Sequence, residues 1–175
     1  MIKQTGSQSV KESVVMGVDP GTIITGFGIV REEGKKILPL DYGCIKPPAS
    51  KKLSDRYWII YSALLDLMNR YRPDTIVVET QYVSKNVQSA MKLGMARGGV
   101  IIAAKSRGLP IYEYSPTKAK LAVTGSGRAG KEQVQAMTQR LLNLPAPPEP
   151  DDAADALALA ICHLHAKQSY KGVEI

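Results

Sequence analysis

Four acidic residues stand where structural elements are expected to begin or end, and together they could bind divalent cations. Asp19 follows the apolar run VVMGV and precedes Pro-Gly, and Glu79 ends the second apolar run, DTIVVE. Asp152 and Asp155 open an alanine-rich segment three residues apart, so they project from the same side of a helix. Such an all-oxygen ligand set suits Mg2+ or Mn2+. Two of these ions about 4 Å apart can activate a water and stabilise the leaving oxygen of a phosphodiester, so the pattern predicts a metal-dependent nuclease.

Some of these acids also have a plain structural explanation. Asp-Pro-Gly at 19–21 is ordinary turn sequence, because proline presets φ and glycine tolerates positive φ. Asp151 and Asp152 can cap the free N–H groups of a helix that begins there. Asp155 lies a turn further in, where capping does not account for it. The four acids meet only if this helix packs across the strand ends, and they then repel one another unless cations neutralise them.

Hydrophobic periodicity predicts the elements that must position these acids. Strands are expected at 14–18, 24–30, 37–46, 74–79 and 109–114, and helices at 53–71, 86–107, 115–122, 131–143 and 151–167. The run at 74–79 is continuously apolar, which is typical of a central strand covered on both faces. These elements predict an α/β fold, a mixed five-stranded sheet with helices on both faces. One domain is expected over 14–167, between a flexible N-terminal extension at 1–13 and a C-terminal tail at 168–175.

The charge balance favours a polyanionic partner. Lys and Arg number 23 against 16 Asp and Glu, which gives a net charge of +7 and an isoelectric point near 9.4. A single surface lysine is usually only solvated, but several basic residues recur in predicted loops and at helix starts. The candidate DNA contacts among them are Lys85, Lys118, Lys120, Arg128 and Lys131.

The sequence also suggests a compartment. No segment has the apolar core of a signal peptide, and no apolar run reaches the ~18 residues that a membrane helix needs. Cys44 and Cys162 lie far apart in sequence and outside any CxxC pair, so neither a disulfide framework nor a zinc site is indicated. We therefore expect a cytoplasmic protein with reduced cysteines and no membrane partner.

Four motifs, in their order and spacing, resemble the RuvC family of bacterial Holliday junction resolvases. They are GVDPGTIITGFGIV, IVVETQYVSKNVQSAMKLGMARG, TGSGRAGKEQVQAM and DDAADALALAICHLH, and the resemblance spans about residues 14–167. It implies a ribonuclease H-like fold, a homodimer, and paired magnesium-dependent nicks across a four-way DNA junction that leave ligatable 5′-phosphate ends in recombination and repair. It also implies the branch-migration proteins RuvA and RuvB as partners.

The same resemblance assigns roles to individual residues. The family's four catalytic, metal-binding carboxylates match Asp19, Glu79, Asp152 and Asp155, which implies two Mg2+ per active site, with Mn2+ able to substitute. Its DNA-binding lysines match Lys120 and Lys131, and its aromatic residue at the junction centre matches Tyr82. The extension before residue 14 has no counterpart in the resemblance.

Two other functions compete with a nuclease. The DPGT motif is similar to the phosphate loop of actin-like ATPases and sugar kinases, but 175 residues are too few for their two lobes. A junction-binding architectural protein would need the basic surface but not the four acids. Cleavage of a synthetic junction in Mg2+, compared with a linear duplex, separates these functions.

Several remaining residues are expected to be structural. His163 and His165 do not share a helix face, so we interpret them as structural rather than as metal ligands. Trp58 lies in the apolar stripe of its helix and is expected in the core or at an interface. The helix at 86–105, which has small residues as well as Met91 and Met95, is the candidate dimer interface.

Overall fold

A computed structural model describes residues 12–80, 86–166 and 173–175 of the chain. Its strands are β1 (Ser13–Asp19), β2 (Thr25–Glu33), β3 (Lys36–Ile45), β4 (Thr75–Glu79), β5 (Ile111–Tyr114) and β6 (Val173–Glu174). Its helices are α1 (Leu53–Tyr71), α2 (Val87–Lys105), α3 (Pro116–Thr124), α4 (Lys131–Leu142) and α5 (Asp151–Ala166). The predicted elements are confirmed in type and order, and their ends differ from the predicted ones by at most three residues. None of the helices in the described ranges is long and apolar enough to cross a membrane.

The strands form one mixed sheet in the order β3-β2-β1-β4-β5-β6. Short connections make β1, β2 and β3 antiparallel neighbours, whereas the crossover helices α1 and α2 place β4 and β5 parallel to β1. The predicted mixed sheet is confirmed, but it has six strands rather than five. Val173 and Glu174, from the predicted tail, pair with Glu113 and Tyr112 as a short antiparallel edge strand.

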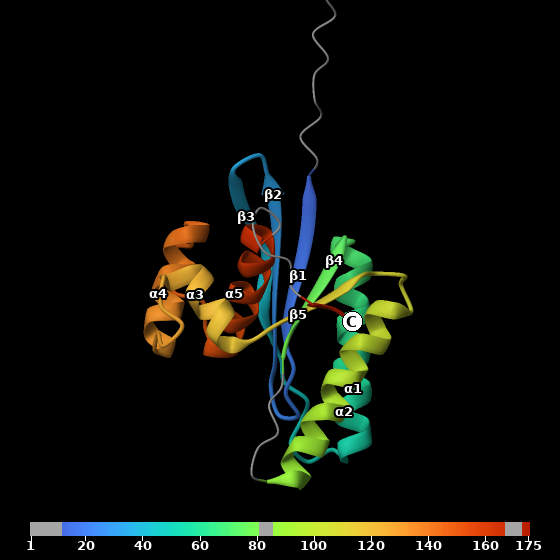
Figure 1. Cartoon of the computed structure of the whole chain (residues 1–175). Helices are drawn as coiled ribbons and strands as arrows, with labels where there is room; N and C mark the ends of the chain where they lie inside the picture. The colour runs from blue at the N-terminus through green and yellow to red at the C-terminus, as the bar shows by residue number, and fades with distance from the viewer. Residues whose placement is uncertain (1–11, 81–85, 167–172) are drawn as a thin grey trace, which may run out of the picture.

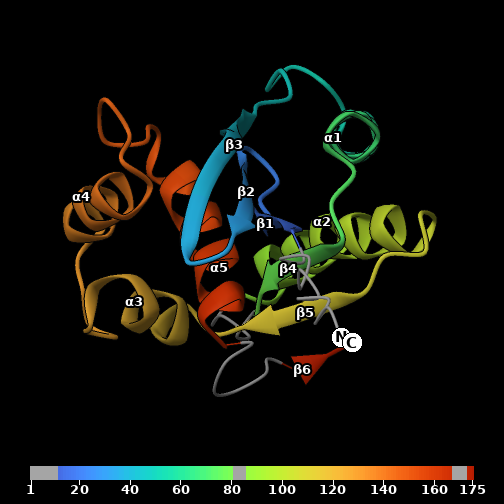
Figure 2. The same cartoon turned by 90° about the horizontal axis from the view of Figure 1, so that it is seen from above.

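Helices cover both faces of the sheet, as Figures 1 and 2 show. α5, with α3 and α4 behind it, packs on one face, and α1 and α2 pack on the other. Because side chains alternate along β1, Val15 belongs to the core under α5, whereas Met16 and Val18 belong to the core under α1 and α2. β4 lies between β1 and β5, which confirms its prediction as a central strand.

α5 lies unusually close to the sheet, because glycines on β1 and β2 leave room for its backbone. A Cβ atom added at Gly17 would lie 2.0 Å from the carbonyl oxygen of Ala156, and one at Gly26 would lie 2.1 Å from that of Asp152. The alanines of α5 are buried against these strands. The helix is therefore held at a fixed height above β1 and β2.

Three structural expectations have different outcomes. His163 is buried, and its Nδ1 lies 3.0 Å from the Tyr114 hydroxyl, which confirms a structural role. Trp58 is 67% exposed, so the expectation that it lies in the core is wrong, and its place at an interface stays a prediction. Cys44 and Cys162 are both free thiols.

Candidate functional site

Asp19 and Glu79 lie side by side at one end of the sheet. β1 and β4 are parallel neighbours in which Val18 pairs with Val78. Asp19 directly follows Val18, and Glu79 directly follows Val78, so the two acids occupy equivalent positions on adjacent strands. The carboxyl ends of parallel strands meet at the same edge of a sheet, where catalytic side chains of such folds commonly lie. The predicted proximity of these two acids is confirmed.

α5 brings the other two acids to the same end. Gly26 pairs with Asp19 across the hairpin and also lies directly under the backbone of Asp152. One turn further along α5, Asp155 lines a cavity of about 210 Å3 together with Glu79 and Lys120. The close approach of α5 to the glycines is therefore what places Asp152 and Asp155 over the strand ends.

The turn that follows Asp19 is held by polar contacts that the sequence did not reveal. Thr25 Oγ1 accepts a hydrogen bond from the Gly21 N–H at 3.2 Å and donates one to the Gly21 carbonyl at 2.9 Å. From α1, the Arg56 guanidinium donates to the carbonyl of Thr22, while its buried Nε has no partner among the described residues. Arg56 is remote in sequence from the turn, and only the packing of α1 brings them together.

Burial and mutual repulsion make it costly to ionise the acids of the site. Burial, followed by the negative charges of Glu79, Asp155 and Asp152, raises the pKa of Asp19 from 3.8 to about 8. Burial and the charge of Asp155 raise the pKa of Glu79 to about 7, although Lys120 opposes this shift. Burial also raises the pKa of Asp155, with Lys120 and Lys131 acting in the opposite direction.

These residues have the chemistry of a hard-cation site. All four offer carboxylate oxygens, and the acids around Asp19 make its ionised form costly unless a cation lies among them. Within the described ranges, no three Asp, Glu, His or Cys side chains converge into a ready-made metal shell. The carboxylates thus share one region but do not yet converge on one point.

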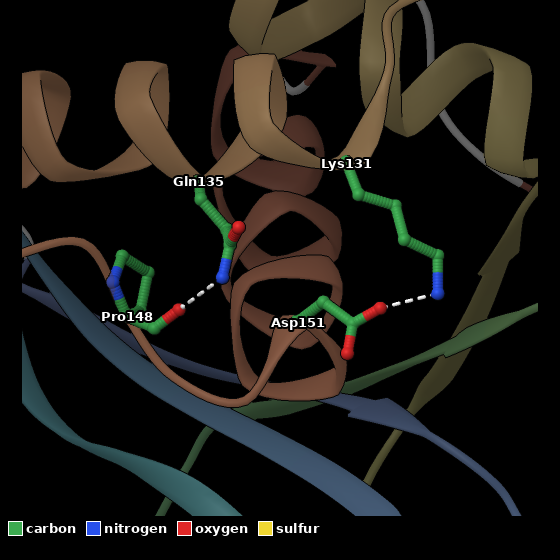
Figure 3. Close-up of polar contacts among 4 residues, drawn as sticks. All are labelled: Lys131, Gln135, Pro148 and Asp151. Atoms are coloured by element: carbon green, nitrogen blue, oxygen red, sulfur yellow. Dashed lines mark hydrogen bonds and ion pairs between the residues drawn. The ribbon is translucent and has the colours of Figure 1, made fainter.

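The predicted DNA contacts occupy different places. Lys120 lines the carboxylate cavity, and Lys131 forms an ion pair with Asp151 (Figure 3). Lys118 instead places its ammonium 4.9 Å from the centre of the Tyr114 ring, and Arg128 is exposed between α3 and α4. Tyr82 and Lys85 lie outside the described residues.

Asp151 is distinguished from the other acids at the start of α5. The Lys131 ammonium, which donates to its carboxylate, lowers the pKa of Asp151, whereas burial raises the pKa of Asp19. This pairing fits the expectation that Asp151 is structural, since it ties α4 to the first turn of α5. Figure 3 shows a second tie, in which Gln135 Nε2 donates to the Pro148 carbonyl at 3.0 Å.

Comparisons with known proteins find similarity over most of the chain. The family described as crossover junction endodeoxyribonuclease RuvC matches residues 15–163. The protein of that name from Protochlamydia amoebophila is 66% identical over 150 residues, which cover 86% of this chain and 89% of that protein. The structure of Thermus thermophilus RuvC is 34% identical, has a TM-score of 0.83, and is matched over 93% of this chain and 99% of its own. T. thermophilus RuvC in complex with Holliday junction substrate gives a TM-score of 0.87 at the same identity and coverage.

Proposed function

The chain belongs to the RuvC family of crossover junction endodeoxyribonucleases, and we propose that it resolves Holliday junctions by hydrolysing DNA strands at the carboxylates of Asp19, Glu79, Asp152 and Asp155. The observation that carries this assignment is the geometry that brings Asp19 and Glu79, at the neighbouring ends of β1 and β4, under the first turns of α5. Burial and the negative charges of Glu79, Asp155, Asp152 and Asp151 together raise the pKa of Asp19 to about 8. A carboxyl held at this electrostatic cost at the end of a strand is more readily explained by a cationic ligand than by folding.

Two Mg2+ ions, or Mn2+ in their place, are the proposed cofactors. Asp19 and Glu79 would hold them from the sheet, and Asp152 and Asp155 from α5. When bound, such ions supply an activated water and stabilise the leaving oxygen of a phosphodiester. The protein keeps the four carboxylates in one region through the β1–β4 pairing and the glycine contacts under α5.

Two basic residues would guide the DNA backbone to these carboxylates. Lys120 lines the same cavity as Glu79 and Asp155, so a phosphate bound there can approach both acids without facing unopposed negative charge. Lys131 lies at the start of α4 and reaches toward the first turn of α5. Tyr82 is proposed to stack on a base at the crossover, which is worth about 1–3 kcal/mol per base, and Lys85, Lys118 and Arg128 remain proposed secondary contacts.

A homodimer is the proposed assembly. Two symmetric cuts need two active sites, and a two-fold dimer presents them to strands of like polarity. One stripe of α2 is apolar and exposed, at Val87, Met91, Met95 and Ile102. A Cβ atom at Gly94 or Gly98 would meet no neighbouring atom within 4 Å, so another helix could approach closely there. Trp58 adds exposed apolar surface on α1, which packs beside α2.

The cellular context follows from family membership. The paired nicks would leave 5′-phosphate ends that a ligase can seal, in DNA recombination and repair. RuvA and RuvB are the proposed partners that deliver the junction. The cytoplasm is the proposed location.

Cleavage of a synthetic four-way junction, compared with a linear duplex of the same sequences, tests this function. We expect Mg2+-dependent nicks at symmetric positions in the junction only. Asp155→Asn should lower the cleavage rate by at least a hundredfold while junction binding is kept, because removing a negative charge beside the phosphates does not weaken binding. Asp151→Asn is the matched control and should cut at near the parent rate. Junction binding without cleavage by the parent protein would favour the architectural function.

A further inference from the structure

A groove that shares no lining residue with the carboxylate cavity lies at the start of α5, and of its residues only Lys131 is already a proposed DNA contact. It has a volume of about 590 Å3 and is lined by Lys46, Lys131, Gln135, Glu149, Pro150 and Asp151. One wall is the start of α4, and the opposite wall is the end of β3. The floor is the segment that leads into α5, whose second residue is Asp152. A DNA strand that leaves the four carboxylates in this direction would cross the groove.

The register of the sheet brings Lys46 to this place. β3 ends at Ile45, which pairs with Thr25, and the preceding Cys44 pairs with Gly26. Gly26 in turn lies under the backbone of Asp152. Lys46 is therefore the first residue beyond the strand at the point where the sheet meets the N-terminal end of α5. Burial raises the pKa of the nearby Cys44 thiol, and the charges of Asp152 and Lys46 act on it in opposite directions.

The two lysines of the groove are in different states. Lys131 is bound to Asp151, although 71% of its side chain stays exposed, so it can donate a further hydrogen bond to an incoming anion. Lys46 is exposed and makes no ion pair with the residues described here. Gln135 is committed to the Pro148 carbonyl and fixes the wall between them (Figure 3). Lys46 is thus the cation most available to a new ligand.

The acids of the groove limit the strength of such a site. Asp151 and Glu149 balance the two ammonium groups, so a free phosphate ion gains little by entering. DNA that is already held at the four carboxylates brings its next phosphates to the groove at a high effective concentration. A weak contact then suffices, and it contributes to affinity through counterion release.

We propose that Lys46 and Lys131 form a binding site for backbone phosphates of the DNA strand adjacent to the cut, with Lys46 as its principal new contact. The ligand class is a DNA phosphodiester bound without base specificity. This inference rests on the proposed function, because the active site must first hold the strand that reaches the groove. It adds a contact directly after the end of β3, on the opposite side of the groove from Lys131.

Measurements of junction affinity as a function of salt concentration, in the absence of divalent ions, test this contact. Lys46→Ala should weaken binding several-fold near physiological salt and reduce the slope of log affinity against log salt by about 0.9. Lys46→Arg should keep the parent slope. Lys36→Ala is the matched control, since it removes the same charge from the first residue of the same strand, at the far end of the sheet. Equal slopes for the Lys46→Ala and Lys36→Ala variants would overturn the proposal.

A modified junction locates the contact on the DNA. Neutral methylphosphonates replace the phosphates next to the mapped cleavage position. On this junction, the Lys46→Ala variant should bind almost as tightly as the parent protein. An undiminished loss would show that Lys46 acts elsewhere and would overturn the proposal. Cleavage by the parent protein in Mg2+ is measured in parallel. If the parent cuts the junction and the Lys46→Ala slope is unchanged, only this inference fails, whereas failure of the parent to bind or cut removes the proposed function itself.

Discussion

Replacing Asp19 by Asn should stabilise the metal-free protein near neutral pH. The folded carboxyl has a pKa of about 8, against 3.8 for an ordinary Asp, because it is buried beside Glu79, Asp155 and Asp152. Between these two values the folded chain keeps a proton that the unfolded chain has released. The free energy of unfolding therefore falls as the pH rises, by about 1.4 kcal/mol per pH unit. Over pH 5 to 7 the loss from this one group is about 3 kcal/mol.

Asn carries no titrating proton and places no charge beside the other acids. In EDTA, the free energy of unfolding of the Asp19→Asn variant should therefore fall less steeply over pH 5–7 than that of the parent. The two slopes should differ by about 1.4 kcal/mol per pH unit, and the variant should be the more stable protein at pH 7. Mg2+ should stabilise the parent more than the variant, since it binds the folded carboxylates. Urea unfolding at several pH values, with and without Mg2+, measures both effects.

Asp151→Asn is the control for this experiment. Its carboxylate has a lowered pKa, because it accepts a hydrogen bond from Lys131, so its contribution to stability is present at neutral pH and lost in acid. Removing it should not stabilise the protein at pH 7. A metal-free parent whose stability is constant over pH 5–7, or an Asp19→Asn variant that is less stable at pH 7, would refute the electrostatic reasoning.

Three further predictions concern packing, DNA contact and assembly. Gly26→Ala should reduce junction cleavage at least tenfold and destabilise the fold by about 1–3 kcal/mol, because its Cβ would collide with the backbone of Asp152. Gly99→Ala on α2, where a Cβ has open space, should keep the parent's cleavage rate and stability. Junction cleavage and urea unfolding measure both effects. Lys120→Ala should make the slope of log junction affinity against log salt concentration shallower by about one. An unchanged slope would place Lys120 away from the phosphates. Met95→Asp should yield monomers in sedimentation at micromolar concentration, and a monomeric parent that still cuts both strands together would contradict the α2 interface.

Local patterns predicted the architecture because each element has its own periodicity. The stripe of α1 and the continuous apolar run of β4 identified those elements. β6 was not predicted, because Val173 and Glu174 are too short for a pattern and depend on the open edge of β5. The apolar stripe of α1 also suggested that Trp58 could be in the core, but most of its side chain is exposed.

The acids of the site were predictable, whereas their supports were not. Two apolar runs that each end in a carboxylate indicated that Asp19 and Glu79 could meet at the strand ends. The bond from Arg56 to Thr22, the ion pair between Lys131 and Asp151, and the groove beside Lys46 each join elements that are distant in sequence. No spacing rule encodes such contacts, because they depend on how α1 and α4 dock on the rest of the fold.

Binding of divalent ions to the four carboxylates is measured most directly by titrating Mn2+ into junction-bound protein and following free Mn2+ by electron paramagnetic resonance. Asp155→Asn protein allows the complex to be compared without cleavage, and Asp151→Asn protein controls for the loss of one nearby charge. In Ca2+-free buffer at 4 °C, the parent and Asp151→Asn complexes should each take up two Mn2+ per chain, and the Asp155→Asn and Asp19→Asn complexes should take up fewer. Equal Mn2+ uptake by all four proteins would contradict a metal site built from these carboxylates.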